Sequence, residues 1–205
     1  ALLARDFLER IAPFERGDPY TQGGLLELRQ RLLRLGYFSS VVVLPEVADR
    51  SDGQVAIRVD VMLSPAQSFE VGVGFSTDTR QRVSLLWRTP RINRHGHSRQ
   101  TSLRWSPVNP ELRLAYTIPL DDPASDVLQV IGRLENNEFG DLESNQRAFA
   151  LRRERTPTGR VIATQLRGLR EEWDAVGEDF SATFLLAGAS YSKRSRRGLA
   201  VEVDG

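Results

Sequence analysis

The pattern of apolar positions changes its period near residue 65, and this change divides the chain into two parts. Before it, apolar side chains recur at the three- and four-residue spacing of amphipathic helices. The clearest run is Leu25, Leu28, Leu32 and Leu35, which ends at Gly36, a residue typical of helix C-termini. After it, apolar and polar residues alternate, which is the period of a strand with one buried face.

The first part, residues 1–65, predicts a small α+β domain. Two helical patterns precede two strand-like runs, and Asp52-Gly53 between the strands is a turn signal. The elements are expected at residues 3–11, after Asp18-Pro19, at 37–45 and at 55–63. Asp followed by Pro is a favourable way to begin a helix, because Asp caps the N-terminus and Pro tolerates the first helical position.

The second part, residues 68–205, predicts antiparallel strands without helices. The strand-like runs are about ten residues long, and arginines with small polar residues repeatedly fill the face opposite the apolar one. Aromatic residues fall near strand ends, at Phe75, Trp87, Trp105, Tyr116, Trp173 and Phe180. These three features are typical of a transmembrane β-barrel and favour it over a soluble β-sandwich, which also alternates.

The alternation is not equally clear in every strand-like run. Residues 127–135, 145–155 and 161–170 alternate less cleanly, and in the second of these arginines and apolar residues share one face, which weakens the assignment of that strand. The run near residue 180 is clearer, with Phe180 and Phe184 on the expected apolar face.

The composition excludes several classes of protein. The chain has 205 residues and a net charge of +1, so it carries no strong signature of nucleic-acid binding. It has no cysteine, which excludes disulfides, thiolate metal sites and cysteine nucleophiles. No signal peptide is visible, and no apolar run of about 18 residues predicts a transmembrane helix. A β-barrel remains compatible, because alternating strands keep the mean hydropathy low.

The two histidines, His95 and His97, are the first candidate for a metal site. On a strand, this spacing would present both rings on one face. Their neighbours Asn93, Arg94 and Gly96 instead predict a turn, and no third ligand is close in sequence. We therefore expect a turn without a metal ion.

Other polar motifs also predict turns or solvated surfaces rather than chemistry. Thr77-Asp78-Thr79 resembles an aspartic-protease loop, but Arg80 stands where that loop needs glycine. The acidic segment 135–143 lacks the ligand spacing of a calcium loop. Two acidic pairs are expected to be solvated: Glu135 with Glu138, and Glu171 with Glu172. Arg194, Arg196 and Arg197 are expected in a solvated turn, with contact to lipid phosphate as the alternative. We expect no enzyme, metal or cofactor.

Several segments resemble a known family of outer-membrane proteins. Residues 17–20 (GDPY), the leucine-rich helix and residues 36–39 (GYFS) resemble a POTRA domain. Residues 71–78 (VGVGFSTD), 87–93 (WRTPRIN) and 96–98 (GHS), then Tyr116 to Leu120 followed by Asp122-Pro123, resemble the first barrel strands of the TamA branch in the BamA/TamA superfamily of assembly factors.

The resemblance implies a fold class and a domain organisation. Residues 1–65 would be a POTRA domain that lacks its first strand. Residues 68–205 would be the first part of an antiparallel transmembrane barrel, with roughly eight or nine strands of the family's sixteen or so. The chain is therefore expected to be an internal fragment, with its POTRA module in the periplasm and its strands in the bacterial outer membrane.

The resemblance also implies a function without covalent chemistry. The first barrel strand is expected to form a seam that opens and templates client strands; its residues are Phe69, Val71, Gly72, Val73, Gly74 and Phe75. Asn93, Gly96 and His97 would form a turn like that of the family. The expected partners are a TamB-like protein anchored in the inner membrane, autotransporter-type clients and outer-membrane lipid, with no nucleic acid. The alternatives are a two-partner-secretion-type pore and a soluble β-rich binding module.

Overall fold

The computed structural model describes residues 3, 5–46, 55–77, 80–140, 142–157, 159–175, 178–194 and 200–204. The turn expected at Asp52-Gly53 lies outside these residues. So do Asp78 and Thr79 of the protease-like motif, and Arg196 and Arg197 of the basic turn.

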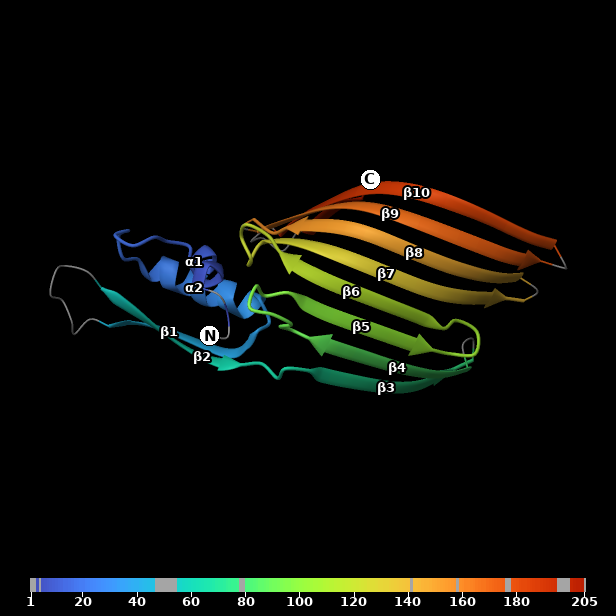
Figure 1. Cartoon of the computed structure of the whole chain (residues 1–205), viewed down its shortest axis with the longest axis horizontal. Helices are drawn as coiled ribbons and strands as arrows, with labels where there is room; N and C mark the ends of the chain where they lie inside the picture. Colours follow the sequence, from blue (N-terminus) through green and yellow to red (C-terminus); the bar gives the residue numbers. More distant parts are fainter. Residues whose placement is uncertain are drawn as a thin grey trace.

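The N-terminal domain consists of two helices and a two-stranded antiparallel sheet (Figure 1). Its elements are α1 (Arg5–Ile11), α2 (Gln22–Arg34), β1 (Phe38–Glu46) and β2 (Ala56–Leu63). The helices pack on the hairpin through a buried cluster of apolar side chains: Leu3, Phe7, Ile11, Leu28, Leu32, Tyr37, Phe38 and Val41. The predicted leucine stripe therefore does supply part of the core of this domain.

The start of α2 differs from the sequence expectation. Thr21 is the N-cap, and its side-chain oxygen accepts a hydrogen bond of 3.1 Å from the backbone N–H of Gly24. Asp18 instead accepts from the backbone N–H of Glu15 at 2.8 Å, which closes the preceding turn. The helix begins after Thr21 because that hydroxyl meets an otherwise unpaired N–H of the first turn.

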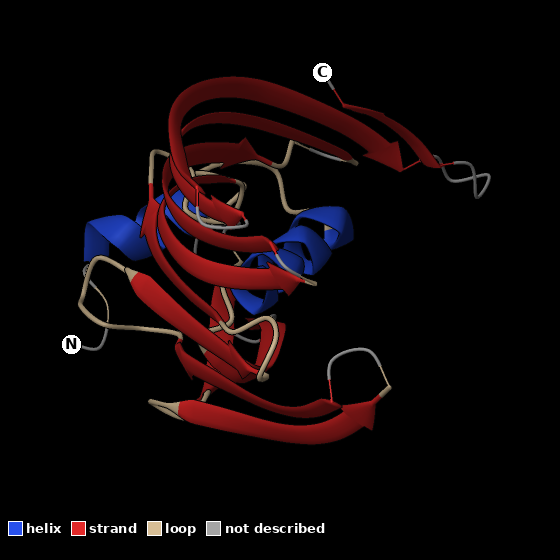
Figure 2. Cartoon of the chain, turned by 90° about the vertical axis from the view of Figure 1, so that its right-hand side faces the viewer, coloured by secondary structure: helices blue, strands red, loops and turns tan. Residues whose placement is uncertain are grey.

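The rest of the described chain is one antiparallel sheet in which each strand pairs with the next (Figures 1 and 2). Its strands are β3 (Ser68–Ser76), β4 (Arg80–Thr89), β5 (Ser98–Trp105), β6 (Glu111–Pro119), β7 (Asp126–Phe139), β8 (Leu142–Arg155), β9 (Arg160–Ala175), β10 (Glu178–Arg194) and β11 (Ala200–Asp204). The sheet curves into an open arc with β3 and β11 as its edges (Figure 2). The predicted α+β domain followed by a partial antiparallel barrel is confirmed.

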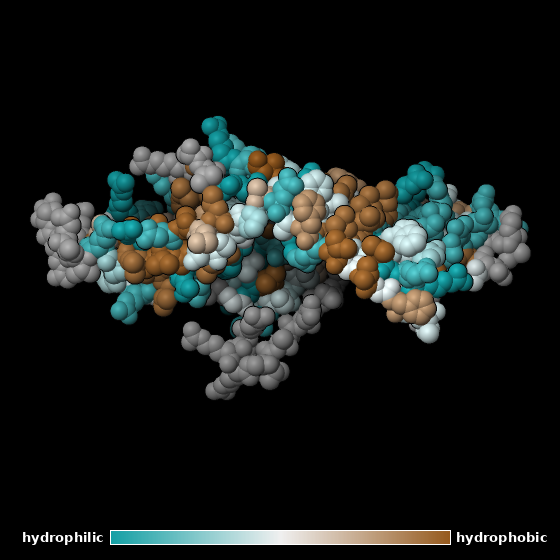
Figure 3. Space-filling model, turned by 90° about the horizontal axis from the view of Figure 1, so that it is seen from below, coloured by the Kyte–Doolittle hydropathy of each residue, from teal (hydrophilic) through white to brown (hydrophobic). Residues whose placement is uncertain are grey.

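The curvature gives the two faces of the sheet different environments. Inward side chains crowd together, so Ala115, Ala150 and Ala163 on the concave face are buried. Outward side chains spread apart, and Val73 on the convex face is 83% exposed. Figure 3 shows hydrophobic side chains over the middle of the molecule and hydrophilic ones toward the end of the sheet far from the helices. An exposed apolar belt of this kind is typical of a surface that contacts something other than water.

The register resolves the segment in which arginines and apolar residues share a face. Residues 142–155 form β8, and Arg147, Phe149, Leu151 and Arg153 all lie on its convex face. The pattern is mixed because the arginines lie at the two ends of a short apolar stretch. This arrangement keeps the guanidinium groups near the edges of the belt, where long side chains reach polar surroundings.

The register corrects the expected aromatic girdle at two positions. Phe180 pairs with Trp173, and both lie on the concave face together with Phe184. The outward residue of β10 is Leu185, which is opposite Gly168 and 77% exposed. Both faces of β10 are apolar around Leu185, so the sequence pattern did not show which of the two alternating sets of side chains points outward.

Neither helix in the described part of the chain is long and apolar enough to cross a membrane.

Candidate functional site: an open sheet edge and a docked helical domain

The first strand of the large sheet, β3, is paired on one side only. It forms a ladder with β4 along its whole length, from Ser68 opposite Arg88 to Ser76 opposite Arg80. Within the described residues no strand pairs with its other edge. An open strand edge presents backbone N–H and C=O groups to any further strand. This edge can therefore bind an extended polypeptide.

The predicted seam residues divide between the two faces of β3. Phe69, Val71, Val73 and Phe75 point outward and are all exposed. The ring of Phe69 stacks on Trp87 of β4 with 5.6 Å between the ring centroids, which anchors one end of the strand to its neighbour. The apolar side of the edge therefore faces the same surroundings as the rest of the belt.

The two glycines of β3 have different surroundings on the concave face. A Cβ atom added to Gly72 would be 2.6 Å from the side-chain oxygen of Ser84, whereas one added to Gly74 would meet nothing within 4 Å. Gly72 thus accommodates its cross-strand neighbour. Gly74 has free space, and glycine there lowers the stability of the strand without any packing reason.

The turn between β4 and β5 contains the residues singled out as a family-like turn. The side-chain oxygen of Asn93 accepts hydrogen bonds from the backbone N–H groups of His95 at 3.0 Å and His97 at 3.1 Å. Gly96 has φ +76°, a conformation that favours glycine. Among the described residues no group of acidic or histidine side chains is arranged to hold a metal ion.

One of the histidines in this turn has a structural contact. The Nδ1 atom of His97 is 2.8 Å from the hydroxyl of Tyr116 on β6. Burial lowers the pKa of His97, and the nearby His95 lowers it further. Both effects favour the neutral imidazole, and the contact joins two neighbouring hairpins at the end of the sheet.

The helical domain docks on the same turn, a contact that the sequence reasoning missed. The hydroxyl of Tyr37 donates a hydrogen bond to the backbone oxygen of Gly96. A Cβ atom at Gly96 would be 2.5 Å from the ring of Phe7, so the glycine allows the two domains to approach closely. Burial raises the pKa of Tyr37 to about 12, partly offset by Arg91, so its hydroxyl stays a donor.

Two further contacts join the helices to the turn between β6 and β7. Arg10 donates to the backbone oxygen of Leu120 at 2.9 Å, and Arg31 forms an ion pair with Asp122 at 3.2 Å. The helical domain therefore touches two consecutive turns at one end of the sheet. We call this the near end and the opposite one the far end. The loop at residues 106–110 lies at the far end (Figure 1).

The acidic pairs considered as catalytic candidates are separated by the sheet. Glu135 pairs on the concave face with Arg133 at 2.7 Å, whereas Glu138 has the parity of the convex face. Glu171 accepts hydrogen bonds on the concave face from Ser144 at 2.6 Å, while Glu172 lies on the convex face. Neither pair brings two carboxylates together, and the concave face is a network of arginines and acids.

The comparisons with known proteins agree with this architecture. Residues 2–62 match the POTRA family, described as surface antigen variable number repeat. The fold is similar to the crystal structure of BamA from Haemophilus ducreyi lacking POTRA domains 1–3, with a TM-score of 0.73 and 12% sequence identity. The N-terminal domain is thus similar to a POTRA domain, and the large sheet is similar in fold to that of BamA. The family model covers the N-terminal domain, and the structural match shows the fold.

The structural match covers nearly all of this chain but less than half of the BamA chain. It covers 94% of this chain and 42% of the BamA chain. At this identity the match establishes the fold, and the chain spans less than half of the length of that structure. The contacts between the helical domain and the near-end turns, and the open edge of β3, are observed in this chain. They are not inferred from the BamA structure.

Proposed function

We propose that this chain is part of an outer-membrane protein assembly or translocation factor, with its POTRA module in the periplasm. The observation that carries the proposal is the open edge of β3 in a barrel-type sheet whose convex face is apolar. The POTRA match and the BamA-like fold support it.

The open edge supplies a physical mechanism for inserting a client strand. In hydrocarbon, each backbone group without a partner costs several kcal/mol, because no water is present to replace the hydrogen bond. A client strand that pairs with β3 satisfies its own backbone and that of the edge together. The nine residues of β3 are about the length of one transmembrane β-strand, so one client strand would be templated along the whole edge.

The glycines of β3 fit an edge that exchanges partners. A strand interior with Gly72 and Gly74 has less side-chain packing and more backbone freedom than one with branched residues. A partner strand is then released more easily, which an assembly factor needs after each client. The neighbouring Phe69–Trp87 stack keeps β3 itself attached to β4.

The POTRA module would receive clients or partners on the periplasmic side. Its hairpin has only β1 and β2 in the described chain, so each strand has an edge that can accept an extended segment by strand addition. We propose residues 41–44 and 55–63 as these edges. By resemblance to the TamA branch, the partner would be a TamB-like protein anchored in the inner membrane, and the clients autotransporter-type proteins.

Reconstitution of the full-length protein tests this function. We expect liposomes that contain it to fold a urea-unfolded autotransporter barrel faster than liposomes with a closed porin, measured by the gel shift between boiled and unboiled samples. A second, unrelated barrel client separates a general factor from a dedicated secretion pore, which would respond to one client only. Equal folding rates in both liposome preparations would contradict the proposal. A protein that stays in the aqueous phase without detergent would instead favour a soluble binding module.

A further inference from the structure

Two arginines lie side by side on the convex face of the sheet, toward its far end. Arg147 of β8 and Arg170 of β9 are direct cross-strand partners, and their side chains are 67% and 59% exposed. Like charges directly opposite each other destabilise a sheet. Glu172 is 3.0 Å from Arg170 and 3.9 Å from Arg147, so one carboxylate serves two guanidinium groups and the cluster keeps one positive charge.

An apolar surface with shallow depressions adjoins the arginine pair on its near-end side. The next row of outward residues across β7, β8 and β9 is Gly132, Phe149 and Gly168. Phe149 is 56% exposed, and a glycine on either side leaves the flanks of its ring uncovered. Leu151 and Leu166 continue the apolar surface in the following row.

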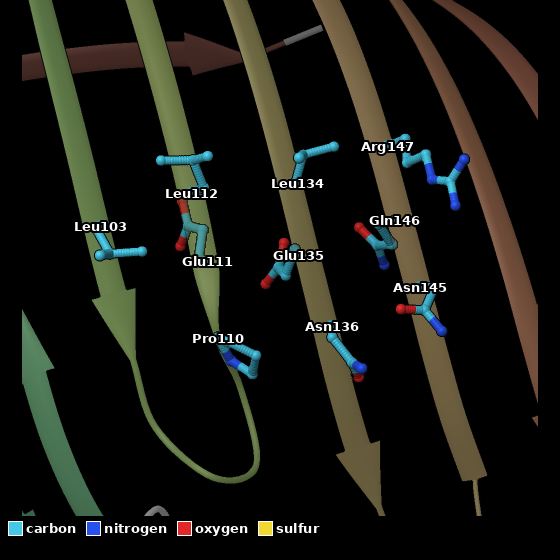
Figure 4. Close-up of a pocket in the computed structure, with 10 residues that line it drawn as sticks. All are labelled: Leu103, Pro110, Glu111, Leu112, Leu134, Glu135, Asn136, Asn145, Gln146 and Arg147. Carbon is cyan, nitrogen blue, oxygen red and sulfur yellow. The ribbon is translucent and has the colours of Figure 1, made fainter.

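A hollow of about 290 Å³ lies beside Arg147, on the side of β5, β6 and β7 and away from β9 (Figure 4). Leu103, Leu112 and Leu134, all outward by register, form part of its wall. Asn136 and Asn145 belong to the same face and lie further toward the far end. In Figure 4 the guanidinium of Arg147 is directed toward β9, where Arg170 and Glu172 lie. Apolar depressions thus lie next to a cationic group.

The position of the pair within the belt explains why these charges need an anion. Arg147 and Arg153 bound the apolar stretch of β8 and are six residues apart, which is about 20 Å along a strand. Barrel strands are tilted by about 35–45°, so this stretch is shorter than an apolar band of about 25 Å. The arginine pair therefore lies on the hydrocarbon side of the headgroup boundary, where an unpaired charge is costly.

We propose that this surface binds a phosphorylated lipid of the outer leaflet, with its phosphate between Arg147 and Arg170. Its acyl chains lie over Gly132, Phe149 and Gly168. Guanidinium groups bind phosphate through charge-assisted, often paired, hydrogen bonds. The inference rests on the proposed function, because it requires the convex face to be in the membrane.

An acidic row at the rim of the sheet does not cancel this attraction. It lies four residues further toward the far end on each strand, at Glu138, Glu143, Asp174 and Asp179. Four residues of strand span about 13 Å. That separation exceeds the screening length of about 8 Å at physiological salt, so the rim acts only weakly on a phosphate held by the arginines.

Lipid retention by the full-length protein in nanodiscs tests the inference. The discs contain phosphatidylcholine with a few per cent of bis-phosphorylated lipid A, and mass spectrometry measures the lipid A that stays with the protein after transfer to detergent. We expect enrichment with the native protein and a loss of about tenfold in R147Q/R170Q, because both phosphate-binding groups are removed. R147K/R170K keeps the charge but not the paired geometry, and we expect it to retain part of the enrichment.

Matched variants separate this site from general effects of charge. R113Q/R152Q removes two arginines from the concave face, and we expect it to retain lipid A as the native protein does. G168V fills a depression beside Phe149, and we expect weaker retention of lipid A. Equal retention by the native protein and R147Q/R170Q would overturn the inference, as would full displacement of the lipid by inorganic phosphate.

The proposed function and this inference fail in distinguishable ways. A native protein that does not enter nanodiscs would overturn both. A native protein that enters them but shows no enrichment of lipid A over dephosphorylated lipid A would overturn the lipid site alone.

Discussion

Replacement of Gly96 by alanine should release the POTRA module from the barrel sheet. Gly96 has φ +76°, which costs an L-residue about 1–2 kcal/mol. The new methyl group would also lie 2.5 Å from the ring of Phe7 and 2.8 Å from the hydroxyl of Tyr37. Displacing these buried groups costs a further 1–3 kcal/mol or so, as overpacking of a core does. The expected weakening of the docked state is therefore about 2–5 kcal/mol.

Gly140 provides a matched control for this substitution. It has φ +64° in a far-end hairpin, and an added Cβ atom would meet nothing within 4 Å. Gly140→Ala thus carries the cost of the backbone conformation without the clash. The difference between the two variants isolates the packing contribution of the docked interface.

Spin labels can measure the docking directly, because the sequence has no cysteine of its own. Cysteines at the exposed positions Arg34 and Glu143 place one label on the POTRA module and one on the far end of the sheet. We expect a narrow distance distribution in the parent and in Gly140→Ala, and a broad one in Gly96→Ala. A distribution in Gly96→Ala as narrow as that of the control would refute the reasoning.

Three further predictions use the same full-length protein. Gly74→Val should strengthen β3 and slow client folding in liposomes, because branched residues favour strands. Gly72→Val should in addition displace the side chain of Ser84. Unchanged folding rates with Gly74→Val would argue against a weak seam. The pKa of His97 is lowered in the fold, so its contribution to stability is present above about pH 6.5 and is lost as the pH falls below that value. The protection factors of the turn amides, each the intrinsic hydrogen-exchange rate at a given pH divided by the measured rate, should fall between pH 7 and pH 5, and constant protection factors would contradict this. A double-mutant cycle of Arg31→Gln and Asp122→Asn should give a coupling of about 0.2–1 kcal/mol between the POTRA module and the sheet, because this pair is partly exposed; zero coupling would show that the pair does not contribute to docking.

The sequence predicted each element and its buried or outward side correctly wherever one side of the helix or strand was clearly apolar and the other polar. The leucine stripe of α2 and the alternation in β3 to β6 each have one apolar and one polar side, so period and face are both defined. In β10 both Phe184 and Leu185 are apolar. Only the register with β9 shows which of them points outward, and that register depends on the whole meander.

The candidate site was only partly predictable for a similar reason. The open edge of β3 follows from its position as first strand of the sheet, which the pattern shows. The docking of Tyr37 on Gly96 joins residues that are 59 positions apart and depends on how two domains meet. The one available signal was a glycine in a turn beside two histidines, and we interpreted it as the requirement of the turn alone.

The arginines of β8 show how a mixed pattern can be informative. Arg147 and Arg153 made the strand look irregular, because a half-buried strand in water would place them opposite the apolar residues. In a sheet with an outward apolar belt they instead mark its two limits. The irregularity was therefore a property of the surroundings of the strand rather than of its secondary structure.

Site-specific photo-crosslinking in cells tests the central claim most directly. Gly74 on the edge strand and Gly132 on the interior strand β7 both have free space for a larger side chain, so each can carry a photoreactive residue. With the full-length protein in growing cells, we predict crosslinks from position 74 to outer-membrane clients during their assembly, and none from position 132. Client crosslinks from both positions alike, or from neither, would contradict the role of the β3 edge.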